Sequence, residues 1–205
     1  MNAPITTTAP AIGESFAGGF FAGLFLLDDG TRYGLIVAPK GEGQHDDTAW
    51  IDNYKAVPGA HSYNNGFANT EAMAEAGSDL AKWARSLRIG GNDDWYLPSQ
   101  DELEICYRNL KPTTEENYCY ARSGINLSAV PPTRPYLPSS PVQTSAETFR
   151  EAGAEAFDDV WYWSSTQHAA DSGYAWSQSF SSGDQYDNDA SSRLRARAVR
   201  RISID

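Results

Sequence analysis

The residues best suited to catalysis are the three histidines and the acidic side chains near them. His45 is followed directly by Asp46 and Asp47, and such a group can hold a metal ion or accept a proton. The sequence contains no Gly-x-Ser-x-Gly turn, phosphate-binding loop or His-Glu-x-x-His motif that would supply a nucleophile or a zinc site. A solvated loop is therefore the favoured interpretation of His45, and the sequence predicts a protein that is not an enzyme.

The two cysteines, Cys106 and Cys119, give no further sign of catalysis or metal binding. The sequence has no Cys-x-x-Cys pair and no cluster of cysteines with histidines. Two reduced, partly buried thiols are favoured over a disulfide.

A different chemistry is indicated by residues 174–192, which are almost wholly Ser, Asp, Tyr, Asn, Gln, Gly and Ala. Tyrosine offers rigid contact area and small polar side chains form adaptable hydrogen bonds, so this composition is typical of binding surfaces. A solvated hairpin without a binding role has the same composition and stays the alternative. Alternation predicts that Trp176 faces inward while Ser177 and Ser179 face outward, with Tyr186 as the large anchor. The residues expected to contact a ligand are Tyr174, Ser177, Ser179, Ser181, Asp184, Tyr186, Asp187, Asn188, Asp189 and Ser191.

The same stretch contains a group of oxygen ligands, namely Asp184, Asp187, Asn188 and Asp189. Calcium prefers such ligands, but their order does not match an EF-hand loop. The sequence therefore predicts no cofactor, with calcium as the alternative.

A basic run near the C-terminus stands out in an acidic protein. It could bind a sulfated or phosphorylated glycan, but pairing with the protein's own acids along a strand is favoured. The run comprises Arg193, Arg195, Arg197, Arg200 and Arg201.

The elements that position these residues begin with a hairpin. Residues 1–15 are rich in Thr, Ala and Pro, which predicts a flexible tail ahead of a single domain over residues 16–205. Residues 20–27 and 32–38 form a predicted β-hairpin because Asp29-Gly30 supplies a tight turn. Residues 39–68 are expected to form a long loop.

Two main helices follow in the prediction. Apolar residues from Met73 to Leu87 recur at helical spacing, which predicts one helix capped by Asn69 or Thr70 and ended by Gly90-Gly91. A second helix starts at Ser99, which forms a capping box with Glu102.

The rest of the chain is predicted to be irregular and then β. Prolines mark residues 111–141 as irregular surface structure, and a short third helix is expected from Thr144 or Ser145 to Gly153. Period-two alternation predicts strands over residues 161–166, 174–180 and 195–202, with a turn at 181–184.

Charge and apolar content restrict the partners. The net charge of −11 disfavours nucleic acid, since an acidic surface repels phosphates. No stretch approaches the roughly 20 apolar residues of a membrane span. The apolar run Ala17–Leu27 lacks a preceding Lys or Arg and a cleavage site, which predicts synthesis in a cytoplasm without a signal peptide.

Three separated segments carry a family resemblance. They are Asp94-Trp95-Tyr96-Leu97-Pro98-Ser99-Gln100-Asp101-Glu102-Leu103, then Trp161-Tyr162-Trp163-Ser164-Ser165-Thr166, then Ala175–Phe180 with Arg195–Arg200. In this order they resemble the Lcl C-terminal-like family, named for the C-terminal domain of a collagen-like bacterial adhesin, most strongly over residues 90–202. The resemblance implies an α+β, C-type-lectin-like fold with an irregular antiparallel sheet, two main helices and long loops, used for binding.

The N-terminal half is similar to a phage-borne version of this family, through Gly34–Lys40 and Met73–Gly77. This likeness implies a virion-tail protein that binds a host-surface glycan or protein, contacts other tail proteins and forms a homo-oligomer, a trimer by analogy. In some relatives a retroelement diversifies the hairpin, and the composition of residues 174–192 fits that pattern. A structural tail or particle protein without a ligand, or a bacterial adhesin domain, is the alternative.

Overall fold

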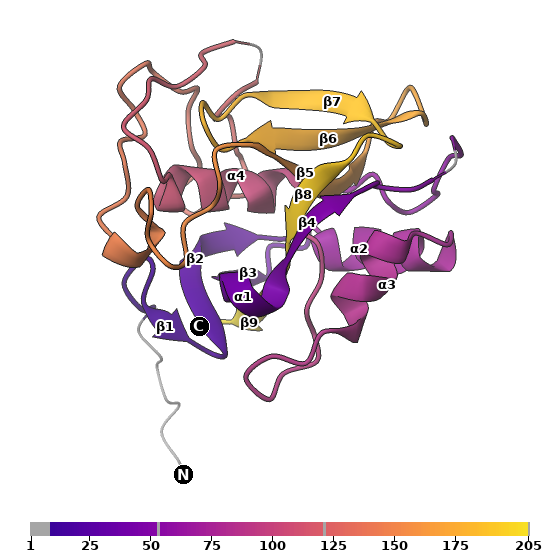
Figure 1. The fold of residues 1–205 in the computed structure, drawn as a ribbon, viewed down its shortest axis with the longest axis horizontal. Helices are drawn as coiled ribbons and strands as arrows, with labels where there is room; N and C mark the ends of the chain where they lie inside the picture. Colours follow the sequence, from indigo (N-terminus) through magenta and orange to yellow (C-terminus); the bar gives the residue numbers. More distant parts are fainter. Residues whose placement is uncertain (1–8, 53, 121, 205) are drawn as a thin grey trace.

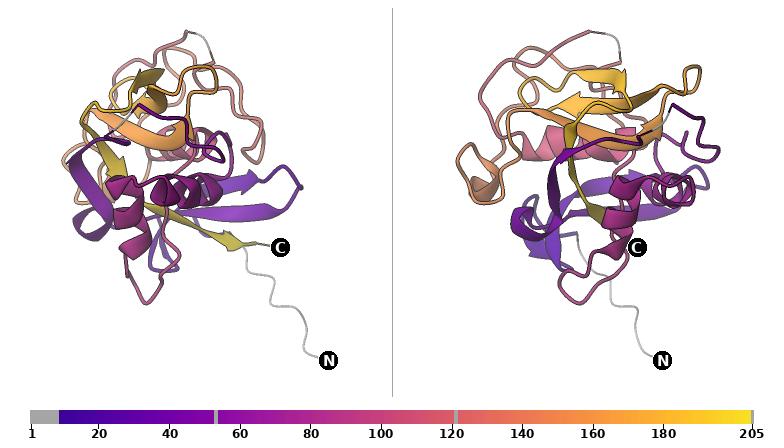
Figure 2. Two further views of the ribbon diagram at one scale, coloured as in Figure 1. Left: turned by 90° about the vertical axis from the view of Figure 1, so that its right-hand side faces the viewer. Right: turned by 45° about the vertical axis from the view of Figure 1, so that its right-hand side comes forward.

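The computed structural model describes residues 9–52, 54–120 and 122–204, which form an α+β fold of two mostly antiparallel sheets (Figures 1 and 2). The four-stranded sheet has the order β1 (Ser15–Phe16), β2 (Gly19–Leu26), β3 (Arg32–Val37) and β9 (Val199–Ser203). The five-stranded sheet has the order β4 (Gln44–Thr48), β8 (Leu194–Arg197), β5 (Trp161–Gln167), β6 (Tyr174–Ser179) and β7 (Gln185–Asp189). This architecture agrees with the C-type-lectin-like fold expected from the sequence.

The first hairpin is confirmed. β2 and β3 pair antiparallel, and the turn between them has Gly30 at φ +80°. Asp29 Oδ1 accepts a hydrogen bond from the Thr31 amide at 2.9 Å, which fixes the turn. Of the predicted tail, residues 1–8 lie outside the described residues, while the Gly13 amide already donates to the carbonyl of Phe21 at 2.8 Å.

The predicted single helix after residue 69 is wrong, because the segment forms two helices. α2 (Gly66–Glu75) is capped by Asn65, and α3 (Asp79–Ser86) is capped by Ser78. Between them Gly77 has φ +105°, a conformation that ends a helix at little cost only for glycine. The apolar residues do recur at helical spacing, but this spacing continues across Gly77, where the first helix ends and the second begins.

The second main helix, α4 (Gln100–Leu110), begins as predicted. The side chain of Ser99 accepts from the Glu102 amide, and the Glu102 carboxylate accepts from the Ser99 amide, so the capping box is complete. α4 contacts β2 of one sheet and β5 and β6 of the other, which places it between the two sheets (Figure 1).

The predicted third helix is reduced to a single 3₁₀ turn at Glu147–Phe149. The flanking backbone bonds to another segment, since the Thr144 amide donates to the carbonyl of Lys111 and the Glu151 amide to the carbonyl of Pro112. These long-range bonds replace the local bonds of a helix. Residues 111–146, in their described part, contain only isolated bridges and turns, in agreement with the predicted irregular structure.

The last predicted strand is in fact two strands in different sheets. β8 joins the five-stranded sheet and β9 the four-stranded sheet, and Ala198 between them bonds to Ala38 and Gly43. The predicted long loop 39–68 also contains structure, because it includes the short helix α1 (Lys40–Gly43) and β4.

The two largest core clusters lie against opposite sides of the five-stranded sheet. One cluster, between that sheet, α4 and β2–β3, includes Phe25, Tyr107, Tyr162 and Phe180. The other contains residues of α2, α3 and β5, with α2 packed on both α3 and β5, and it includes Trp163. Among the described residues, no helix combines the length and apolar character that crossing a membrane requires.

Candidate ligand-binding hairpin

The residues predicted to bind a ligand belong to β6, β7 and the turns at their ends, at one edge of the five-stranded sheet (Figure 1). In the turn between β6 and β7, the Ser179 amide donates to the carbonyl of Asp184 and the Gly183 amide donates to the carbonyl of Ser179. Gly183 has φ +76°, and a Cβ there would lie 2.3 Å from the Tyr107 ring of α4. The turn therefore rests directly on the helix, which holds the hairpin in place.

The register divides the hairpin into two faces. Tyr174 lies opposite Asp189 and Trp176 opposite Asp187, so these four side chains share one face. Ala175 lies opposite Asn188 and Ser177 opposite Tyr186, on the other face. β7 has a neighbour on one side only, which leaves its outer edge at the surface.

The predicted outward orientation of the serines is wrong. Ser177 is 1% exposed and Ser179 is 4% exposed, whereas Trp176 is only half-buried. The reason is Trp163 on β5, which lies opposite Ser177 and fills the core on that side, leaving room only for small residues on β6. The alternation is as predicted, but both faces of β6 are covered, since Gln178 and Phe180 on the Trp176 face are buried as well.

The two serines have structural hydrogen bonds instead. Ser177 Oγ donates to the Tyr186 carbonyl at 3.0 Å and accepts from Asn188 Nδ2 at 2.6 Å. Ser179 Oγ and Ser181 Oγ lie 2.8 Å apart. These contacts link β6 to β7 and the turn, so Ser177 and Ser179 stabilise the hairpin and are not available to a ligand.

The other predicted residues reach the surface. Tyr186 is 58% exposed and Tyr174 is 37% exposed, and Ser191 is also exposed. The half-exposed members are Ser181, Asp184, Asp187, Asn188 and Asp189. Tyr174, Asp187 and Asp189 reach the surface on one face of the hairpin, and Tyr186 and Asn188 on the other.

One residue of this surface was missed by the sequence. Tyr54, in the segment before α2, is 64% exposed, and its hydroxyl lies 2.9 Å from Asp189 Oδ2 and 3.2 Å from Ser191 Oγ. Asp189 Oδ1 accepts from the amide and the hydroxyl of Ser191 at 2.9 and 2.7 Å. The hydrogen bonds from Ser191 and Tyr54 lower the pKa of Asp189 below its usual value.

The four oxygen-bearing side chains considered for calcium do not converge. Asp184 precedes β7 and Asp189 ends it, while Asp187 and Asn188 are neighbours in a strand and point to opposite faces. Within the described parts of the chain, no three His, Cys, Asp or Glu side chains gather in a way that could hold a metal ion.

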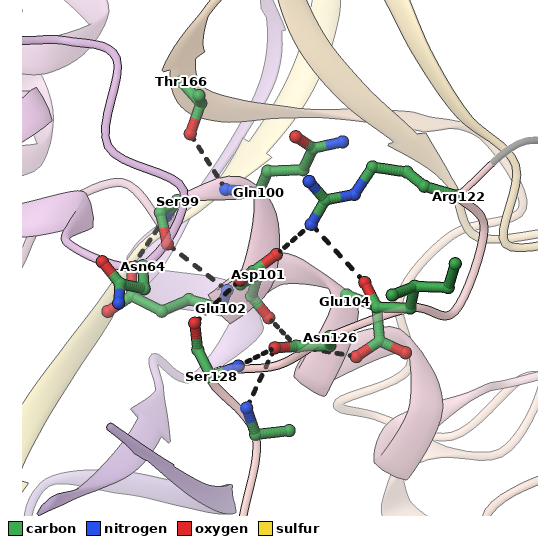
Figure 3. A network of polar contacts seen from close by, with 12 residues as sticks. Asn64, Ser99, Gln100, Asp101, Glu102, Glu104, Arg122, Asn126, Ser128 and Thr166 are labelled. Atoms are coloured by element: carbon green, nitrogen blue, oxygen red, sulfur yellow. Dashed lines mark hydrogen bonds and ion pairs between the residues drawn. The ribbon is translucent and has the colours of Figure 1, made fainter. Parts of the chain in front are cut away.

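A second concentration of polar side chains lies at the start of α4 (Figure 3). Asp101 accepts from Arg122 Nη2 at 2.6 Å and from Ser128 Oγ at 2.9 Å. Glu104 accepts from Arg108, Asn126 and Tyr136. Burial raises the pKa of the carboxyl groups of Asp101, Glu102 and Glu104.

Each carboxylate of this network is matched by donors from other segments. Glu102 accepts from the Ser99 amide at 2.7 Å, the Gly66 amide at 3.0 Å and the Tyr96 hydroxyl at 2.7 Å. The network therefore connects α4, the start of α2 and the irregular segment after residue 122. Because every carboxylate of the network is hydrogen-bonded within the protein, the network stabilises the fold and leaves no carboxylate for a ligand.

The sequence pattern of the Lcl C-terminal domain matches residues 44–200. This chain belongs to the Lcl C-terminal domain family. The match includes α4, the buried network and the whole hairpin, and it excludes β1, β2 and β3. No curated protein matches the chain. Membership in a family named for an adhesin's C-terminal domain supports an adhesin-like, surface-binding role.

The arginine run of this Lcl C-terminal domain pairs with the protein's own acids, as predicted. The pairs are Arg193 with Asp47, Arg195 with Asp46 and Asp158, Arg197 with Glu155, and Arg200 with Asp94. Arg201 donates to Asn65 Oδ1, and its guanidinium lies 4.9 Å from the centre of the Tyr33 ring. The run is therefore an internal set of ion pairs and stacked cations, which disfavours its use as a basic patch for a sulfated glycan.

The remaining sequence candidates have ordinary structural positions in the domain. Both cysteines are free thiols, as favoured from the sequence, but they are not both partly buried, since Cys106 is buried and Cys119 is exposed. The predicted solvated loop at His45 is wrong, because His45 lies in β4, pairs with Ala196 and packs edge-on against Trp83.

Proposed function

We propose that this chain is a receptor-binding protein, displayed on a phage or prophage tail, that binds a host-surface glycan or protein through the β6–β7 hairpin. The observation that carries the proposal is the contrast within the hairpin between buried anchoring residues and exposed tyrosines among polar side chains. Trp163, Ser177 and Phe180 anchor it, while Tyr186 and Tyr174 project from it. Exposed tyrosines among small polar residues are typical of binding surfaces.

The resemblance to the phage-borne version of the family also suggests where the protein is made and how it assembles. The protein is synthesised in the host cytoplasm and incorporated into the virion tail, where it contacts other tail proteins as a homo-oligomer, a trimer by analogy. Multivalent display would strengthen weak single-site binding by orders of magnitude. It binds no nucleic acid, does not insert into a membrane, needs no cofactor and turns over no substrate.

Host-cell binding of purified variants tests the site. Tyr186→Ala and Asp187→Ala should each weaken binding, because an exposed aromatic anchor typically contributes about 2 kcal/mol or more at a hot spot. Leu137→Ala is the matched control, since Leu137 is 62% exposed in the proline-rich segment and does not belong to the hairpin. Unchanged binding of both hairpin variants together with weakened binding of Leu137→Ala would move the site to residues 131–141.

The alternatives give different results. A structural tail or particle protein would show no binding to host cells at all, even as an assembled oligomer. A bacterial adhesin domain would bind to surfaces but would be found on bacterial cells instead of virions. Electron microscopy of labelled virions separates that case from the tail protein.

A further inference from the structure

One end of the hairpin carries aromatic rings and carboxylates together on one sheet face. This aromatic–acidic patch consists of Tyr54, Tyr174, Trp176, Asp187 and Asp189. We infer that the receptor is a protein and that the aromatic–acidic patch accepts its Arg or Lys side chains. The inference rests on the proposed function and adds the chemistry of the partner.

The register brings the patch together. Tyr174 is paired with Asp189 and Trp176 with Asp187 across β6 and β7, so the rings and carboxylates alternate on the same face. Tyr54 joins from a distant part of the sequence through its hydroxyl, which bonds to Asp189. A Cβ on Gly173 would lie 3.2 Å from the Tyr54 ring, so this ring lies against the residue that precedes β6.

The charge of the patch selects a cation. Neither Asp187 nor Asp189 takes part in an ion pair within residues 9–52, 54–120 and 122–204. Arg193, which follows β7 in sequence, is paired with Asp47 instead. Hydrogen bonds from Ser191 lower the pKa of Asp189, so this carboxylate is negatively charged at neutral pH. A sulfated or otherwise anionic glycan would be repelled here, whereas an Arg or Lys side chain would be attracted.

The aromatic rings add a second reason for the same choice. The faces of Tyr and Trp rings attract cations, and arginine stacks on them well because its guanidinium is planar. The chain uses this contact elsewhere, since the Arg122 guanidinium lies 4.7 Å from the centre of the Tyr63 ring. Tyr54 and Tyr174 offer exposed rings without such a cation among the described residues. A protein that presents several basic side chains fits a patch with two carboxylates and three rings better than a single small amine does.

The test uses the full chain and three probes: a short peptide of alternating Gly and Arg, a Gly–Glu peptide of equal length, and a heparin fragment. Binding is measured by titration calorimetry at low and high salt. The Gly–Arg peptide should bind, and added salt should weaken it, because exposed charges are screened. Asp187→Asn and Tyr54→Ala should each weaken binding by about fivefold, as expected for exposed ionic and cation–π contacts.

Glu75→Gln is the matched control, because Glu75 is an exposed carboxylate on α2 and the substitution removes the same charge. Equal affinities of Asp187→Asn and Glu75→Gln for the Gly–Arg peptide would overturn the inference, because the attraction would then come from net charge alone. Tighter binding of heparin than of the Gly–Arg peptide would also overturn it.

Host-cell binding separates this inference from the proposed function. If Tyr186→Ala reduces host-cell binding while salt and Asp187→Asn leave it unchanged, the hairpin is the receptor site but its partner is not basic. If Tyr186→Ala, Asp187→Asn and Tyr54→Ala all bind host cells as well as the unaltered chain, both the inference and the proposed function are overturned. Reduced binding of all three variants, with the control unaffected, supports both.

Discussion

The start of α4 and the β6–β7 hairpin are both dense in oxygen-bearing side chains, yet they are built in opposite ways. At α4 the carboxylates of Asp101, Glu102 and Glu104 are buried and each is matched by donors from other segments. On the hairpin, Asp187 and Tyr186 lie at the surface and contact little else in the described chain. Buried carboxylates that are matched by donors therefore stabilise the fold, whereas exposed carboxylates without ion pairs are the ones we propose for recognition.

The largest expected effect follows from breaking the buried region. Glu102→Ala leaves the amides of Ser99 and Gly66 and the hydroxyl of Tyr96 without their acceptor. Unpaired buried donors are costly, so the free energy of unfolding should fall by about 3–5 kcal/mol in urea denaturation. Glu75→Ala, on the surface of α2, is the control. A loss below about 1 kcal/mol for Glu102→Ala would show that water replaces the carboxylate easily.

The next largest effect is a difference in unfolding free energy between substitutions of two tryptophans in the five-stranded sheet. Trp163 is fully buried, and Trp163→Ala should cost about 3–5 kcal/mol. Trp176 is half-buried, so Trp176→Ala should cost about 1–2 kcal/mol and leave the domain folded. Circular dichroism and urea denaturation of both variants measure the difference. Equal losses would mean that the Trp176 face is part of the core.

A smaller effect should appear as a pH dependence of stability. Burial raises the pKa of Asp101, and the Arg122 charge offsets only part of the shift. A carboxyl group with a raised folded pKa contributes stability that is complete below its unfolded pKa and is lost as pH rises through its folded pKa. Asp101→Asn does not titrate and retains an acceptor for Arg122, so its unfolding free energy should vary less with pH.

The measurement is a series of urea unfolding curves from acidic to neutral pH. Asp93→Asn, an exposed neighbour of the same segment, should show the unaltered dependence. If the unaltered chain instead gains stability relative to Asp101→Asn as pH rises from 3.8, burial does not raise the pKa of Asp101 and the ionised carboxylate stabilises the fold.

The smallest effect is expected in the exposed region. Tyr186→Ala and Asp187→Ala remove side chains that reach the surface, so the free energy of unfolding should change by no more than about 0.5 kcal/mol in thermal denaturation. Such variants can then be used in binding assays without a folding artefact. A loss of about 2 kcal/mol in either would show that the hairpin surface is structural after all.

The features that the sequence predicted well depend on local signals. The Ser99–Glu102 capping box lies within one helical turn, and the first hairpin follows from an Asp-Gly turn between two apolar runs. The family segments are also local patterns, and they led to the correct fold class.

The features that were missed depend on contacts between distant residues. The burial of the Ser177 face of β6 depends on Trp163 of the neighbouring strand, which the sequence of β6 does not show. Tyr54 reaches Asp189 across 135 positions, and no local pattern connects them. The break at Gly77 was visible as a glycine, but only the paired caps at Asn65 and Ser78 show that it separates two helices.

The sheet order has a practical consequence for how the protein can be attached. The first and last strands, β1 and β9, belong to the four-stranded sheet, and the hairpin lies at the far side of the five-stranded sheet (Figure 1). A linker, tag or carrier joined beyond either strand therefore leaves the molecule on the side away from β7. Such a conjugate, immobilised on a sensor or extended from a fibre, would point the hairpin outward without any redesign of the chain.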